Sequence, residues 1–163
     1  PLLSTLSVGG TVANAQMFAA AKLWQFVDEH KSTWFTAVPT IHKVLLANAE
    51  RDFTHATISH GHPRLRFIRS GSAALPPEFL ARIEETFLAP LIEAYGMTEA
   101  AQLICANPLP QDGNRYAGSV GICAGPRGKV FDPVTFEPAE IDESGMTTGE
   151  MCISGPSVMS GYA

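Results

Sequence analysis

The sequence predicts an α/β fold, in which a parallel β-sheet with flanking helices is followed by a small β-rich subdomain. Over residues 1–105, short apolar runs rich in β-branched and aromatic residues alternate with segments whose apolar residues recur at helical spacing. This alternation is typical of a parallel sheet covered by helices. Over residues 106–163 the pattern changes to short strands joined by turns rich in Pro and Gly. We therefore expect two portions of one domain, with the boundary near residue 105.

The individual elements follow from these patterns in chain order. An apolar helix over residues 2–8 is expected to end at Gly9 and Gly10, because glycine commonly ends helices. Further helices are predicted at residues 18–30, 41–50 and 76–87, the last with a proline in its first turn, where a missing N–H costs nothing. Strands are predicted at residues 11–14, 33–38, 65–69, 90–95, 128–132 and 150–154, with a polar loop at 51–63.

Composition and charge exclude several classes of function. The chain has 163 residues, of which 45% are apolar and 17% charged, which is enough for a single core. Its net charge of -5 argues against a nucleic-acid-binding face, because such a face needs a basic stripe. The sequence has no apolar stretch long enough to span a membrane. The oligomeric state is not specified by these properties.

The cysteines and the chain ends indicate where the protein works and how much of it this chain represents. Cys105, Cys123 and Cys152 are odd in number and form no Cys-x-x-Cys pair, which predicts an intracellular, reducing compartment, either cytoplasmic or peroxisomal. The chain opens at Pro1 without a Met and stops at Ala163. We therefore expect an internal segment of a longer protein.

One short segment after a predicted buried strand carries most of the chemical information. It combines a carboxylate at each end with an aromatic ring, a bare backbone and a hydroxyl, in the order Glu93, Ala94, Tyr95, Gly96, Met97, Thr98 and Glu99. A hydroxyl and an acid at a helix N-terminus suit a phosphate and its Mg²⁺. The spacing alone is equally compatible with a structural role, in which Thr98 is the N-cap of a helix over residues 99–106 and Glu99 complements its dipole.

A second segment, Gly71-Ser72-Ala73, follows the neighbouring predicted strand. Its small residues are compatible with a tight connection before the helix at Pro76, or with a surface along which a planar base can lie. Parallel strands end on the same side of a sheet, so this loop and the Gly96–Glu99 loop are expected at one edge. Ligands of open α/β sheets usually bind at that edge.

Three ordered motifs resemble those of the adenylate-forming enzymes, the acyl-CoA synthetase and luciferase superfamily. The first is Arg69-Ser70-Gly71-Ser72-Ala73-Ala74-Leu75 and the second is Tyr95-Gly96-Met97-Thr98-Glu99. The third comprises Gly118-Ser119-Val120-Gly121 and the run from Gly149 to Tyr162. The resemblance covers nearly the whole chain and implies an AMP-binding domain with the fold predicted above.

The resemblance also implies roles for individual residues. Thr98 would contact the α-phosphate and Glu99 would help to hold magnesium, which makes them the candidate catalytic residues. The nucleotide itself would contact residues of both loops, with the Tyr95 ring against the adenine. The candidate cofactor-binding residues are Gly71, Ser72, Ala73, Glu93, Ala94, Tyr95, Gly96, Met97 and Thr98.

The implied function is that of a fragment of an ATP-dependent acid–CoA ligase, with ATP, Mg²⁺ and coenzyme A as cofactors and co-substrates and a small carboxylic acid as substrate. The resemblance is closest to oxalate–CoA ligase-like members, although Ala101-Gln102 replaces a Ser-His pair and Ser154 replaces an Arg. The alternatives are an adenylation domain that loads a carrier protein and a non-catalytic nucleotide-binding module. The segment alone is expected to be inactive, because the phosphate-loop and C-terminal lysines of the family have no counterpart in it.

Other conspicuous residues are expected to be structural. His55, His60 and His62 lie close in sequence, but no acidic or cysteine partner completes a zinc site. Trp24 and Trp34 are expected in the core. His42 is expected at a helix surface, although the resemblance places its helix near the acyl pocket.

Overall fold

The computed structural model describes residues 2–15, 17–53 and 65–162, and its main feature is a mixed five-stranded sheet. The strands lie in chain order, and the first three pair in parallel, whereas the last two pair antiparallel. Their bounds are β1 (Trp34–Ala37), β2 (Phe67–Ser70), β3 (Leu91–Met97), β4 (Gln102–Ala106) and β5 (Ile122–Cys123). The predicted α/β class is confirmed, and β3 is the strand at which the pairing changes from parallel to antiparallel.

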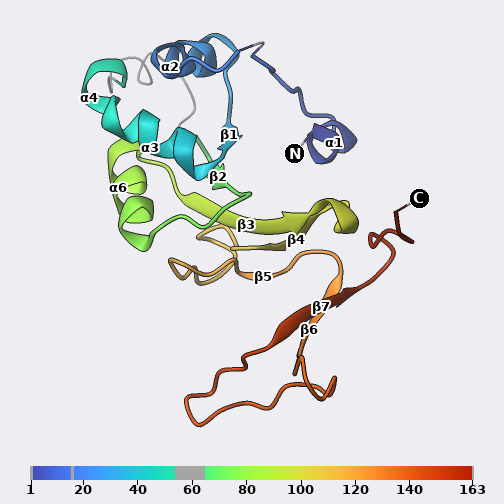
Figure 1. The fold of residues 1–163 in the computed structure, drawn as a ribbon. Helices are drawn as coiled ribbons and strands as arrows, with labels where there is room; N and C mark the ends of the chain where they lie inside the picture. Colours follow the sequence, from blue (N-terminus) through green and yellow to red (C-terminus); the bar gives the residue numbers. More distant parts are fainter. Residues whose placement is uncertain (1, 16, 54–64, 163) are drawn as a thin grey trace.

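The helices gather around the parallel half of the sheet, and a separate β-ribbon extends away beyond β5 (Figure 1). The helices are α1 (Leu2–Ser7), α2 (Ala20–Glu29), α3 (Pro39–Ala47), α4 (Ala49–Asp52) and α6 (Pro77–Phe87), with a short 3₁₀ turn, η1 (Thr98–Ala100). The ribbon consists of β6 (Arg127–Phe131) and β7 (Glu150–Ser154), which pair antiparallel. Within the described residues, no helix is long and apolar enough to cross a membrane.

Most predicted elements are present with shifts of a few residues at their ends. The predicted strand at residues 11–14 is wrong, because this segment has no regular structure. A strand needs a partner for its backbone groups, and β1, the edge strand of the sheet, pairs only with β2 in the described chain. The helix predicted at residues 41–50 begins at Pro39 and is interrupted at Asn48, whose side chain donates a 2.8 Å hydrogen bond to the Val44 carbonyl.

The core lies between the helices and the parallel strands, and aromatic rings fill its centre. The Trp24 ring lies 4.6 Å from the Phe53 ring and 4.6 Å from the Phe87 ring, measured between centroids. Trp34 is half-buried on β1 and stacks on Phe67 of β2 at 5.0 Å. Trp24 is therefore in the core, as predicted, whereas Trp34 lies outside the core cluster on the edge strand.

His42 corrects one prediction, because its side chain is fully buried (0% exposed) and not at the surface of α3. Its Nε2 lies 3.3 Å from the carbonyl oxygen of Arg69, and burial lowers its pKa. The face of α3 that carries His42 packs toward β2, because His42 contacts the Arg69 carbonyl, and Leu45 on the same face is also buried. The helical spacing of residues 42 and 45 was present in the sequence, but a polar residue on an apolar face was interpreted as exposed.

A polar cluster fixes the end of α6 against the start of β3. The Glu84 carboxylate on α6 accepts hydrogen bonds from the backbone N–H of Leu91 and from the Arg115 guanidinium. The guanidinium also donates to the Leu91 carbonyl at 3.0 Å. These contacts set the position of the strand that leads into the candidate site.

Candidate functional site

The candidate site lies where β2 ends beside β3, which continues beyond it to Met97. Ser70 of β2 is opposite Glu93 of β3 in the parallel register. A Cβ added to Gly71, the next residue, would lie 3.3 Å from the Ala94 carbonyl oxygen, so the two predicted segments are in close contact there. Ser72 has a left-handed backbone (φ 74°), and both Ser72 and Ala73 are exposed. The structure therefore brings the loop after β2 against Ala94, and the Gly96–Glu99 loop follows farther along the same strand.

Tyr95 and Gly96 form the middle of this surface. The Tyr95 side chain is 40% exposed at the end of β3, which leaves its ring available to a planar ligand. A Cβ on Gly96 would lie only 1.5 Å from the Gln102 carbonyl oxygen of β4. The β3–β4 register is irregular between Tyr95 and Gly96. Glycine is thus required here by the close approach of two backbones, independently of any ligand.

The chain reverses directly after Met97, and this corrects the alternative helix prediction. Residues 99–106 do not form an α-helix, because η1 is a single turn and residues from Gln102 onward form β4. Ala101 (φ 51°) and Gln102 (φ 82°) adopt left-handed backbone conformations that turn β4 back along β3. The residue at the N-cap position of η1 is Met97, and no side chain caps the turn. The capping role considered for Thr98 is therefore wrong, and its side chain is exposed at the tip of a hairpin.

Glu99 lies beside Thr98 and contacts the third motif. The Tyr162 hydroxyl donates a hydrogen bond to the Glu99 carboxylate, and the Met159 N–H donates to the Glu99 carbonyl at 2.8 Å. The bond from Tyr162 lowers the pKa of Glu99 and raises that of Tyr162. Glu99 is therefore ionised at neutral pH. The contact with Tyr162, distant in sequence, was not predicted, and its only signal was that Tyr162 closes the third motif.

Glu93, at the other end of the segment, has a different environment. Its side chain is only 6% exposed, and the Gly118 N–H donates a 3.2 Å hydrogen bond to Oε2. Burial raises the pKa of Glu93, while hydrogen bonds from the backbone of Gly118 and Leu75 lower it to a smaller extent. The carboxylate thus joins the loop after β2 to the Gly118–Gly121 motif. Its predicted contact with a ligand stays a prediction.

Asn107 supports the same junction and was not singled out in the sequence. Its backbone N–H donates to the Glu93 carbonyl at 2.9 Å, and its buried side chain donates to the Ser119 carbonyl. Gly121 (φ 78°) lies so close that an added Cβ would be 2.4 Å from the Asn107 backbone nitrogen. An Asn directly before a Pro usually indicates a turn, so the sequence offered no signal for this role.

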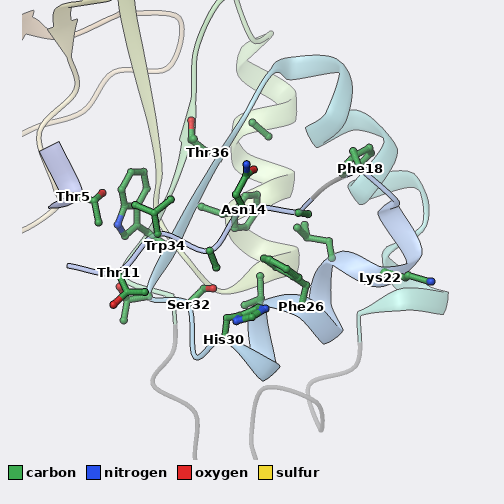
Figure 2. Close-up of a pocket in the computed structure, with 18 of the residues that line it drawn as sticks. Thr5, Thr11, Asn14, Phe18, Lys22, Phe26, His30, Ser32, Trp34 and Thr36 are labelled. Carbon is green, nitrogen blue, oxygen red and sulfur yellow. The ribbon is translucent and has the colours of Figure 1, made fainter. Parts of the chain in front are cut away.

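A cavity of about 960 Å³ lies elsewhere in the molecule, along the edge of β1. It is enclosed by α2, β1 and the irregular segment after α1, and Figure 2 shows Asn14, Phe26 and Trp34 among its lining residues. None of the predicted site residues contributes to its wall. The predicted site residues, at the end of β2 and along β3, therefore lie outside this cavity.

Glu99 and Thr98 are compatible with magnesium but not with a site made of protein ligands alone. Among the described residues, no group of three or more His, Cys, Asp or Glu side chains could hold a metal. Mg²⁺ is commonly held by one or two carboxylates together with substrate phosphates. An ionised Glu99 with a neighbouring hydroxyl fits that pattern. His55, His60 and His62 lie outside the described residues.

Comparison with known proteins places this geometry in a family. The chain is 44% identical over 163 residues to an oxalate–CoA ligase of Arabidopsis thaliana, covering 99% of this chain and 30% of that protein. It is 38% identical over 160 residues to a sulfoacetate–CoA ligase of Cupriavidus necator, covering 98% of this chain and 29% of that protein. The chain therefore spans less than a third of the length of these relatives.

Solved structures and a family model agree with these relatives. The crystal structure of ATP-bound MatB from Rhodopseudomonas palustris matches with a TM-score of 0.79 and 28% identity, covering 97% of this chain and 29% of MatB. The family model described as AMP-binding enzyme matches residues 1–163. The chain therefore belongs to the AMP-binding enzyme family.

Proposed function

We propose that the protein carrying this chain is an ATP-dependent acid–CoA ligase. It would convert a carboxylate and ATP into an acyl-AMP and pyrophosphate, and then transfer the acyl group to the thiol of coenzyme A with release of AMP. The observation that carries this proposal is the contact between Gly71 and Ala94, where an added Cβ would lie 3.3 Å from the carbonyl oxygen. This contact puts the small-residue loop beside the residue that precedes Tyr95, and it supports a site in which the loop would offer a bare surface and the exposed Tyr95 ring an aromatic face to a base.

The phosphate contacts would lie further along the same strand. Thr98 comes three positions after Tyr95, a separation of roughly 10 Å in an extended strand. The ring and the hydroxyl would therefore contact different parts of one nucleotide. Thr98 would donate a hydrogen bond to the α-phosphate, and Glu99 would hold magnesium. When bound, the metal would neutralise charge on the phosphate that accepts the carboxylate.

We propose a small acid with a second anionic group as the substrate. The two relatives are named for oxalate and sulfoacetate, and both acids carry a second acidic group beside a carboxylate. Arg69 is a candidate partner for that group, because its half-buried guanidinium lies 3.9 Å from the Cβ position of Gly71. It donates a 3.4 Å hydrogen bond to Thr36, and burial lowers its pKa.

Coenzyme A is favoured over a carrier protein as the acyl acceptor, because both relatives are named CoA ligases. An intracellular location, cytoplasmic or peroxisomal, belongs to the same proposal, since all three thiols are free in the structure. The division into a sheet portion and a β-rich portion near residue 105 also stays a proposal.

Acid-dependent ATP–pyrophosphate exchange by the full-length protein tests the adenylation step. We expect exchange with oxalate, malonate or sulfoacetate that clearly exceeds exchange with benzoate or a long-chain fatty acid. Arg69→Leu should raise the KM for the preferred acid far more than the KM for ATP, whereas Gly71→Val should do the reverse. ATP binding without exchange for any acid would indicate a non-catalytic module. Exchange without formation of an acyl-CoA would indicate a carrier protein as acceptor.

A further inference from the structure

We propose that Cys105 and Cys123 form a reversible disulfide across the β4–β5 pair. Cys105 lies on β4 and Cys123 lies on β5, and the two residues are direct register partners. Their Sγ atoms are 3.7 Å apart, close enough for a hydrogen bond between the thiols. The third cysteine, Cys152, lies on β7 opposite Lys129, so it has no cysteine as its register partner.

The backbone geometry of this pair suits a disulfide. The Ala124 N–H donates a 2.8 Å hydrogen bond to the Ile104 carbonyl, which lies one residue outside the cysteine pair on each strand. This pattern makes Cys105 and Cys123 a non-hydrogen-bonded pair, for which the Cα atoms are roughly 4.5 Å apart. Disulfides join Cα atoms about 4.4–6.8 Å apart. The bond can therefore form at the lower end of this range by rotation of the side chains, with both strands in place.

Access and packing assign different roles to the two sulfurs. Cys123 is exposed, whereas Cys105 is 3% exposed, so an oxidant reaches Cys123 first. Burial, together with the neighbouring thiol, raises the pKa of Cys105 to about 11. The Cys123 sulfur also lies against β6, since a Cβ added to Gly128 would be 2.8 Å from it. The bare backbone at Gly128 leaves room for the sulfur to move.

A hydroperoxide can serve as the oxidant that forms the disulfide. The Cys123 thiolate attacks the terminal oxygen, the O–O bond breaks, and an alcohol leaves after taking up a proton, which produces a sulfenic acid. The Cys105 sulfur then attacks the Cys123 sulfur and loses its proton, and the S–O bond breaks with release of water. Two thiols and one hydroperoxide become one disulfide, one alcohol and one water. A dithiol reverses the reaction by thiol–disulfide exchange.

The position of the pair connects it to the candidate site. Tyr95, Cys105 and Cys123 are successive register partners across β3, β4 and β5. Side chains of directly opposite residues lie on the same face of a sheet. The disulfide would therefore tie the strand next to Tyr95 to the segment that follows the Gly118–Gly121 motif. It is a modification site in its own right and does not depend on the proposed ligase activity.

Peptide mapping of the full-length protein after treatment with hydrogen peroxide or graded glutathione buffers tests the proposal. Arg115 lies between the two cysteines, so trypsin places them on different peptides, and Lys129 separates both from Cys152. We expect a Cys105–Cys123 cross-linked peptide in most molecules under oxidising conditions, and its loss after dithiothreitol. Cys152→Ser is the matched control and should leave the cross-link unchanged, whereas Cys105→Ser or Cys123→Ser should remove it.

Two results would overturn the inference. In one, Cys105 remains fully available for alkylation after unfolding of the oxidised protein. In the other, Cys123 is found linked to Cys152 or to a second molecule instead of Cys105. Both are detected in the same digest, and neither depends on whether the protein activates an acid.

Discussion

The two carboxylates at the ends of the signature segment, Glu93 and Glu99, belong to one strand and its turn but have opposite environments. Glu93 is 6% exposed, and burial raises its pKa. Glu99 lies at the hairpin tip, where the hydrogen bond from Tyr162 lowers its pKa. The first is bound by backbone amides of two loops, and the second by a phenol near the end of the chain.

This difference separates two kinds of motif residue that look alike in the sequence. A buried carboxylate satisfied by backbone N–H groups fixes the loops around it, because removing it leaves those donors without a partner. An ionised carboxylate at an accessible tip can bind a cation. The comparison predicts that changes at the Glu93 end act mainly on stability, and changes at the Glu99 end mainly on catalysis.

The largest effect is expected at Gly96, which lies between Glu93 and Glu99 in the sequence. A Cβ there would lie 1.5 Å from the Gln102 carbonyl oxygen, so β3 and β4 must separate. Gly96→Val should lower the free energy of unfolding by about 3 kcal/mol or more, at the upper end of overpacking effects. Urea denaturation measures the change. Gly125→Ala is the matched control, because an added Cβ there meets nothing within 4 Å. Equal stability of both variants would mean that β3 and β4 do not approach each other as closely as described.

Thr98→Val is the next test and concerns the tip alone. If Thr98 donates to a charged phosphate, the full-length protein should lose roughly 1.5–3 kcal/mol of transition-state stabilisation. That loss is about a ten- to hundredfold decrease in adenylation rate. The melting temperature should hardly change, because the side chain is exposed and caps no helix. A lower melting temperature with an unchanged rate per folded molecule would instead assign Thr98 a structural role.

The pH dependence of stability, measured with a Glu→Gln substitution at each carboxylate, tests the comparison further. Because the pKa of Glu93 is raised in the folded state, its contribution to stability is complete below the unfolded value near 4.3 and is lost as pH rises through the folded value. The pKa of Glu99 is lowered, so its contribution is present above that value and is lost as pH falls. Stability differences between wild type and Glu93→Gln or Glu99→Gln, measured from pH 3 to 7, should therefore change in opposite directions. If both stability differences changed in the same direction with pH, the opposite pKa shifts of Glu93 and Glu99 would be contradicted.

The smallest effect is expected from Tyr162→Phe, which removes only the phenol hydroxyl. Without this donor, the pKa of Glu99 should return toward its ordinary value, and the acid limb of the rate–pH profile should move to higher pH. The rate at neutral pH should change little, since Glu99 remains ionised there. An NMR titration of the Glu99 carboxyl measures the shift directly, and an unchanged pKa would mean that the contact does not persist in solution.

The sequence predicted the parallel part of the fold well, because periodicity distinguishes longer helices from short strands. It failed where short apolar runs lack that information, at residues 11–14 and 99–106. The second failure has a specific cause: Ala101 and Gln102 adopt left-handed conformations that neither residue type indicates in a sequence. The sequence therefore does not indicate the turn that makes residues 102–106 a strand.

For the site, the motifs predicted which loops meet but not what each side chain does. The contact between Gly71 and Ala94 follows from parallel pairing, which the alternation of elements implies. The burial of Glu93 depends on Leu75 and Gly118, which come from two distant segments. No local pattern encodes such a convergence, so Glu93 and Glu99 could not be told apart before the structure.

The change of pairing at β3 has a mechanical consequence. Gly71 lies at the end of the parallel block supported by α3 and α6, whereas Tyr95, Thr98 and Glu99 belong to the part of the β3–β4 hairpin that extends beyond β2. Under the proposed function, the base of a nucleotide would lie between Gly71 on the block and Tyr95 on the hairpin, and its α-phosphate would contact Thr98 at the hairpin tip. Its binding would hold the hairpin against the block, and backbone amides of β4 should then exchange with solvent more slowly.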